Sequence, residues 1–135
     1  MPKINILKRT KEYTHFEIKE PKYQFYFHLY LYETRIGLHM NTKRKDIEGL
    51  VWGKLHKQKP KEDELVMTCE MHLHKECIDV RVVAHECLHA ALAHYRITEG
   101  LPEFLETHPD DNEENLCHLL SYYCSIAYSI IYNEF

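Results

Sequence analysis

The strongest constraint on the fold is a change in the period of the apolar residues midway along the chain. Residues 13–19, 23–32 and 64–74 alternate between apolar and polar side chains, which is typical of strands with one buried face. Residues 79–94 and 112–132 instead place their apolar side chains at helical spacing. Strands followed by helices predict an α+β domain in which the helices pack on an antiparallel sheet.

Two shorter segments refine this outline. Residues 36–40 are expected to extend the strand at 23–32 or to pair with it. A turn-rich, lysine-rich stretch from Asn41 surrounds a short apolar piece at residues 50–52. Asp79 suits the N-cap of the first long helix, because its side chain can accept a hydrogen bond from the first helical turn.

Size and composition limit the class of protein. The chain has 135 residues, 44% of them hydrophobic, which predicts a single domain over residues 1–135. It contains no run of about 18 apolar residues and no basic leader followed by an apolar stretch. The five cysteines form no C-x-x-C pair and are odd in number, so we expect reduced thiols. These features predict a soluble cytoplasmic protein without a membrane span.

Charge is divided unevenly along the chain. Residues 1–62 carry 14 Lys and Arg against 7 Asp and Glu, whereas residues 63–135 carry 3 against 14. A basic half is typical of a surface that binds nucleic acid or another acidic partner. The alternative is a set of solvated loops, because the lysines of residues 41–64 are interleaved with Gly, Pro and acidic residues.

The segment His85-Glu86-Cys87-Leu88-His89 has the pattern H-E-x-x-H. Residues four apart project from the same side of a helix, so His85 and His89 can bind one metal ion, with Glu86 close enough to act on a metal-bound water. Zinc is the metal that this pattern favours, because it lowers the pKa of its bound water toward about 7. The sequence therefore predicts zinc as cofactor and Glu86 as general base.

Chance is the alternative explanation of this motif. The composition of the chain gives roughly 0.1 accidental occurrences of the pattern, so the pattern alone does not decide. The surrounding residues 82–93 are otherwise apolar and uncharged. A helix that is apolar nearly all round is expected to be buried, and buried His and Glu side chains need partners, which a metal supplies.

With these residues around its motif, the sequence resembles the zincin metallopeptidases. Zincins have uncharged residues around H-E-x-x-H, and the residues here that match are Val83, Ala84, Cys87, Leu88, Ala90 and Ala91. The resemblance implies an antiparallel sheet beside the metal-binding helix, with an edge strand that pairs with the backbone of the substrate. By its order and polarity, the segment 64–74 is expected to be that edge strand.

The third zinc ligand decides the subclass. The metzincin pattern requires a Gly and a His where this chain has Leu92 and Tyr95. The chain is more similar to gluzincins, and to small metallopeptidases encoded by phages and their hosts. That resemblance implies Glu114 as the ligand, in the segment Glu114-Asn-Leu-Cys117-His118, with Glu113 as the competing choice. Alternatively, either glutamate completes a capping box behind an N-cap Asp at position 110 or 111.

Several other histidines have two interpretations. His72 and His74 share one strand face, so they either contribute to a second metal site or substrate contacts, or are exposed strand histidines. His94 is expected near a helix C-terminus, where a charged His is favourable. His118 lies one turn after Glu114 and either donates to a zinc ligand or has a structural role.

A second, weaker resemblance is to Spartan-type proteases, which cut proteins crosslinked to DNA. His85–Ala90 fits their motif, but their third His is missing from residues 99–104, where Leu101 and Pro102 stand. Taken together, the sequence predicts a zinc-dependent peptidase that acts on a protein or peptide. The main alternative is a zinc-stabilised binding module for a host factor or nucleic acid, and the third is a motif without metal.

Overall fold

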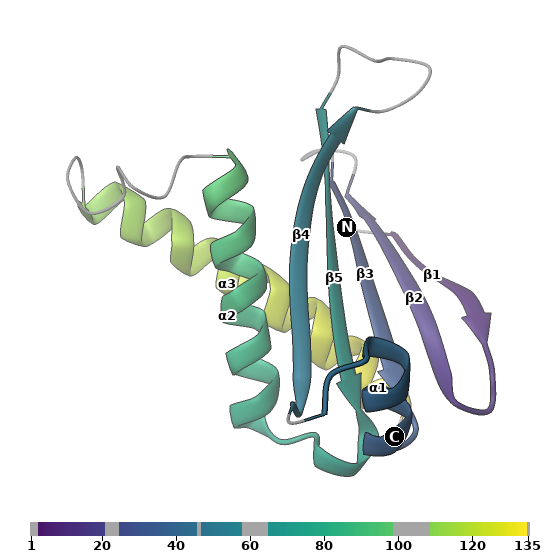
Figure 1. Ribbon diagram of the computed structural model, residues 1–135. Helices are drawn as coiled ribbons and strands as arrows, with labels where there is room; N and C mark the ends of the chain where they lie inside the picture. The colour runs from purple at the N-terminus through teal and green to yellow at the C-terminus, as the bar shows by residue number, and fades with distance from the viewer. Residues whose placement is uncertain (1–2, 21–24, 46, 58–64, 99–108, 135) are drawn as a thin grey trace.

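The computed structural model describes residues 3–20, 25–45, 47–57, 65–98 and 109–134, which form a five-stranded sheet with helices packed on it (Figure 1). In chain order, the elements are β1 (Lys3–Arg9), β2 (Tyr13–Glu20), β3 (Phe25–Tyr32), α1 (Arg35–Thr42), β4 (Gly49–Lys57), β5 (Leu65–His74), the 3-10 helix η1 (Lys75–Cys77), α2 (Val80–Thr98) and α3 (Pro109–Glu134). The predicted α+β class is confirmed, with strands in the first half and both long helices in the second.

The sheet is mixed, so the prediction of an antiparallel sheet was wrong for one pair of strands. The strand order is β1-β2-β3-β5-β4, and β3 and β5 run parallel, whereas the other neighbours are antiparallel. After β3 the chain passes through α1 and β4 before β5 enters between β3 and β4. Apolar alternation is the same in parallel and antiparallel strands, so it does not report direction.

The strand at the edge of the sheet beside α2 is β4, not β5. The prediction that residues 64–74 form the edge strand was therefore wrong. β5 is buried on both faces near its end, since Met71 and Leu73 face the helices while His72 and His74 are buried on the opposite face. The polar histidines on that second face made an internal strand look like a half-exposed one.

Residues 36–40 form part of helix α1 rather than a strand, which corrects the prediction. The Thr34 hydroxyl accepts a hydrogen bond from the Gly37 N–H at 3.0 Å, and Lys43 ends the helix with a φ of 59°. Only Leu38 of this helix is buried, whereas Ile36 and Met40 are exposed. The alternation of these three residues imitates a strand, but the two helix caps decide the local structure.

The core lies between the sheet and the two long helices. Phe27, Leu29 and Leu31 of β3 point into it, as do alternate residues of β5. Tyr123 of α3 meets Phe27 edge to face with ring centroids 5.1 Å apart, and α3 lies behind the sheet in Figure 1. Fully burying a side chain of this size stabilises the fold by about 1.5–3 kcal/mol. The opposite face of the sheet is covered at one end by α1.

Helix α2 is buried on one side only, so the prediction of a buried metal-binding helix was wrong for the histidine side. Val83, Cys87 and Ala90 have no exposed surface, whereas His85 and His89 are exposed. The helix packs on α3 and on the sheet with its small residues and leaves Leu88 and the histidines at the surface. The apolar residues around the motif therefore did not mean that every side of the helix is buried. Apolar side chains such as Leu88 can be solvent-exposed.

Candidate metal centre

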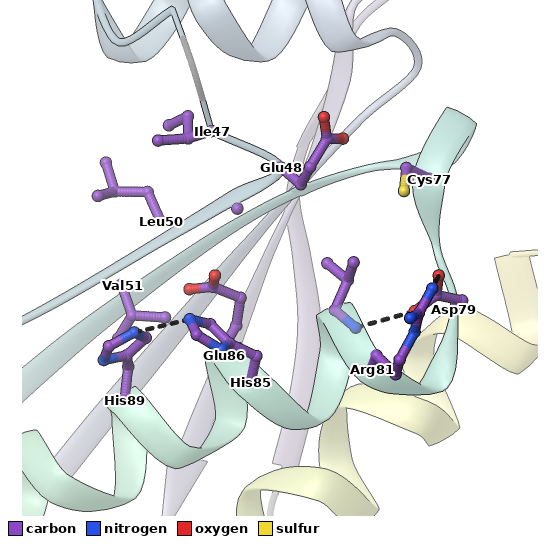
Figure 2. A pocket seen from close by; sticks show the side chains of 12 residues that line it. Ile47, Glu48, Leu50, Val51, Cys77, Asp79, Arg81, His85, Glu86 and His89 are labelled. Carbon is purple, nitrogen blue, oxygen red and sulfur yellow. Dashed lines mark hydrogen bonds and ion pairs between the residues drawn. The ribbon is translucent and has the colours of Figure 1, made fainter.

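The start of α2 sets the direction of the motif side chains. The Asp79 carboxylate accepts a hydrogen bond from the Val82 N–H at 2.9 Å, and the Asp79 carbonyl accepts one from the Val83 N–H at 3.1 Å. The predicted N-cap is confirmed. With its first turn held in this way, α2 points His85 and His89 toward one side and Glu86 toward the start of β4 (Figure 2).

The two histidines of the motif converge on one another. His85 Nε2 lies 3.1 Å from His89 Nε2, and the ring centroids are 4.7 Å apart. Two nitrogens bound to one tetrahedral zinc, each at 2.0–2.1 Å, are about 3.3 Å apart. The spacing of the two nitrogens therefore fits a zinc ion that both imidazoles bind. As the sequence predicts, one face of the helix carries both histidines.

Glu86 lies between α2 and β4 and is only 6% exposed. A Cβ atom at Gly49 would lie 2.7 Å from Glu86 Cγ and 3.0 Å from Oε1, so only glycine leaves room for this carboxylate. Burial raises the pKa of Glu86, and the nearby His89 and His85 lower it in part. No described residue donates a hydrogen bond to the carboxylate.

These side chains line a cleft of about 680 Å³ between the start of β4 and the exposed side of α2 (Figure 2). Residues 47–51 form one wall, and the motif residues lie in the other. The carboxylates of Glu48, Asp79 and Glu86 outnumber the single guanidinium of Arg81 in this lining. Glu48 is paired with Arg35 and His74, whereas the Glu86 carboxylate lines the cleft beside the two imidazoles.

Both candidates for a third ligand lie outside the described side chains. Glu113 and Glu114 both belong to α3, which begins at Pro109, and the structure does not describe the side chains of residues 109–115. Within the described residues, no group of three His, Cys, Asp or Glu side chains is placed to hold a metal. Because α3 begins at Pro109, Asp110 and Asp111 lie inside its first turn rather than at the N-cap position.

The strand histidines are buried rather than exposed. His72 is hydrogen-bonded through Nδ1 to the Tyr32 hydroxyl at 3.0 Å and through Nε2 to Glu70 Oε1 at 3.2 Å. His74 Nε2 donates to Glu48 Oε2 at 2.5 Å. Both histidines share the face that the sequence predicts, but the hydrogen bonds there are to Tyr and Glu side chains. Both ring nitrogens of His72 are therefore hydrogen-bonded, whereas the buried Nδ1 of His74 has no partner among the described residues.

His94 is a buried neutral residue, which corrects its assignment as a charged group at a helix end. Its Nδ1 lies 2.9 Å from the Tyr123 hydroxyl, and burial lowers the pKa of His94 to about 4. His118 lies on the exposed side of α3, and the five cysteines are all free thiols, as predicted.

The sequence did not predict that the start of β4 forms one wall of this cleft. The apolar piece at residues 50–52 belongs to β4, and Glu48 and Gly49 precede it, but nothing in their spacing connects them to residue 86. Only the sheet order brings β4 next to α2. A glycine at the start of a short apolar strand is the one signal that could have suggested a close approach by another side chain.

Comparisons with known proteins found no relative of this chain. Among the described helices, none has a long enough apolar stretch to cross a membrane. No protein-family model, curated protein or solved structure matches this chain. The function proposed below rests on the residues and geometry of the chain itself.

Proposed function

We propose that this protein is a zinc-dependent peptidase similar to the gluzincins. His85 and His89 are two of the zinc ligands, and Glu114 is the third, with Glu113 as the competing residue. The observation that carries the proposal is the convergence of two Nε2 atoms at 3.1 Å beside a buried carboxylate in one cleft. A structural salt bridge or cap does not require this combination, whereas hydrolysis at a metal does.

Each group has a chemical role in this proposal. Zinc, when bound, supplies a Lewis acid that makes water a nucleophile near neutral pH. Glu86 takes the proton of the attacking water and passes it to the leaving amine. Burial supports this role, because the raised pKa of Glu86 makes its carboxylate a better proton acceptor.

The edge strand β4 supports a peptide as the substrate. β4 pairs only with β5 among the described strands, so no described strand is hydrogen-bonded to its other edge. The residues at its start line the same cleft as the motif. A peptide that adds to this edge gains main-chain hydrogen bonds and runs past Glu86.

Metal analysis of the purified protein tests the ligands. The wild type is expected to hold one zinc ion per chain after dialysis, and His85→Ala and His89→Ala to lose it. Glu114→Ala should lose the metal and Glu113→Ala should keep it, which makes the two glutamates matched controls. A folded wild type without stoichiometric zinc contradicts the proposal and favours a motif without metal.

Glu86→Gln separates the peptidase from a zinc-stabilised binding module. This variant keeps the shape of the side chain but cannot act as a general base. We expect it to retain zinc and lose cleavage of a peptide library that the wild type cleaves, and mass spectrometry detects the products. If the wild type binds zinc but cleaves no peptide, and Glu86→Gln preserves the biological role, then the binding module is correct.

A further inference from the structure

Four ionisable side chains gather on the face of the sheet that is turned away from α2 and α3. His15 and Glu17 lie on β2, His28 lies on β3 and Glu70 lies on β5. In the strand register, His28 is opposite Glu17 on β2 and opposite Glu70 on β5. The residues that alternate with these four, such as Phe27, belong to the core, so the four side chains point to the other face of the sheet. We call them the outer cluster, and the proposed peptidase uses none of them.

The two imidazoles of the outer cluster meet at their ring nitrogens. His15 Nε2 lies 2.8 Å from His28 Nδ1, and the ring centroids are 5.0 Å apart. The His15 ring also stacks on the Tyr30 ring, with centroids 4.1 Å apart and planes inclined by 15°. Tyr30 stacks in turn on His72. This stack of rings restricts the orientation of the His15 imidazole, so its Nε2 is held toward His28.

Both imidazoles of the pair can offer a lone pair to a metal ion. Burial lowers the pKa of His15 and the pKa of His28, and the carboxylates of Glu17 and Glu70 oppose this only in part. A neutral imidazole is the form that binds a metal. Each of the two side chains is partly exposed, so an ion can reach the pair from solvent.

We propose that His15 and His28 bind one divalent transition-metal ion of the Ni²⁺ or Cu²⁺ class, which replaces the proton that the two nitrogens share. Two nitrogens at about 2.0 Å from a metal are about 2.8 Å apart when they meet it at about 90°, and about 3.3 Å apart in a tetrahedron. The observed 2.8 Å matches the first arrangement, which is the tetragonal geometry of Ni²⁺ and Cu²⁺ with nitrogen and oxygen ligands. This site shares no residue with the proposed peptidase centre and does not depend on zinc there.

Water completes the coordination of this ion. Within the described part of the chain, no third His, Cys, Asp or Glu side chain is placed to join two others at a metal. Glu17 Oε1 pairs with Lys19 Nζ at 3.5 Å, and Glu70 Oε1 with His72 Nε2 at 3.2 Å. The two imidazoles are therefore the side-chain ligands that we assign. Because two protein ligands hold a metal less firmly than three, dialysis should remove zinc from this pair, and the expected zinc content of one ion per chain is unchanged.

Titration of the untagged full chain with Ni²⁺ tests the proposal. Ni²⁺ is the probe because Cu²⁺ oxidises exposed thiols such as Cys117. Every protein in the series also carries His85→Ala and His89→Ala, so the motif cannot bind the added ion. Calorimetry measures the dissociation constant and the stoichiometry, and X-ray absorption counts the coordinated imidazoles.

Three variants of this background protein are compared. His15→Gln and His28→Gln each remove one proposed ligand. His39→Gln is the matched control, because His39 is also partly buried and is hydrogen-bonded elsewhere, to the Ile47 carbonyl at 2.9 Å. Thermal unfolding without metal checks that each variant folds. Added Ni²⁺ should raise the melting temperature of the background protein and of His39→Gln, but not that of the two ligand variants.

The background protein is expected to bind one Ni²⁺ per chain through two imidazoles. His15→Gln and His28→Gln should each weaken binding by at least about tenfold, since the loss of even an outer-shell partner costs about 10–100-fold. His39→Gln should leave the affinity unchanged. No binding by the background protein, or equal losses in all three variants, would overturn the proposal and leave the pair as a hydrogen bond only. Tighter binding of Zn²⁺ than of Ni²⁺ by the background protein would overturn the assigned class of metal.

Discussion

Replacing Gly49 with alanine tests how the buried carboxylate of Glu86 is held. A Cβ atom at residue 49 would lie 2.7 Å from Glu86 Cγ, 2.9 Å from Cδ and 3.0 Å from Oε1. Carbon atoms at optimal separation are about 3.5–4.0 Å apart, so the side chain must retreat by about 1 Å. Gly49→Ala therefore forces Glu86 either away from β4 or out of its buried position.

Two opposing effects set the size of the change in stability. Overpacking of a well-filled site costs about 1–3 kcal/mol. The backbone of Gly49 is not left-handed, so alanine also removes conformational freedom from the unfolded chain, which stabilises by about 0.4–1 kcal/mol. We expect a net loss of about 1–2 kcal/mol in the free energy of unfolding. In the proposed peptidase, a displacement of about 1 Å can lower the rate about 100-fold.

A double-mutant cycle isolates the contact with Glu86. Urea unfolding is measured for Gly49→Ala, Glu86→Ala and the double variant, because Glu86→Ala removes every atom with which the new Cβ collides. Gly49→Ala should be destabilising alone but neutral or stabilising when combined with Glu86→Ala. The control is Gly37→Ala in α1, whose nearest neighbour is Thr34 Oγ1 at 3.1 Å and whose effect should add to that of Glu86→Ala. If Gly49→Ala costs the same in both backgrounds, the collision is not with Glu86 and the reasoning is refuted.

Two further predictions concern buried groups. The pKa of His94 is about 4 in the folded protein against 6.5 in the unfolded chain. Because the unfolded state therefore binds the proton first as the pH drops, the free energy of unfolding falls between pH 6.5 and pH 4. In urea unfolding, the free energy of unfolding of the wild type should be about 2 kcal/mol lower at pH 4.5 than at pH 7, and His94→Gln should lack this loss. Equal losses in both proteins would contradict the prediction. Burial raises the pKa of Cys87 and raises that of Cys69 to about 12, whereas Cys117 is exposed. A thiol reagent at pH 8 should label Cys117 in the native protein, and Cys69 and Cys87 only in urea. Peptide mapping measures which thiols are labelled. Rapid labelling of Cys69 in the native protein would refute its burial.

The sequence alone determined the features that depend on local period and capping. The change from alternation to helical spacing predicted the α+β class, and both long helices lie where it placed them. Asp79 caps α2 as its position indicated. The spacing of His85 and His89 placed both imidazoles on one side of the helix, because four residues make nearly one helical turn.

Only the tertiary structure decided which faces are buried and which segments are neighbours. The direction of β5, its internal place in the sheet and the approach of Gly49 to Glu86 all depend on how the chain returns through α1 and β4. The burial of His72 and His74 and the exposure of His85 and His89 reversed what their sequence surroundings indicated. The physical reason is that periodicity records which residues share a side of an element, whereas burial depends on what other elements cover that side.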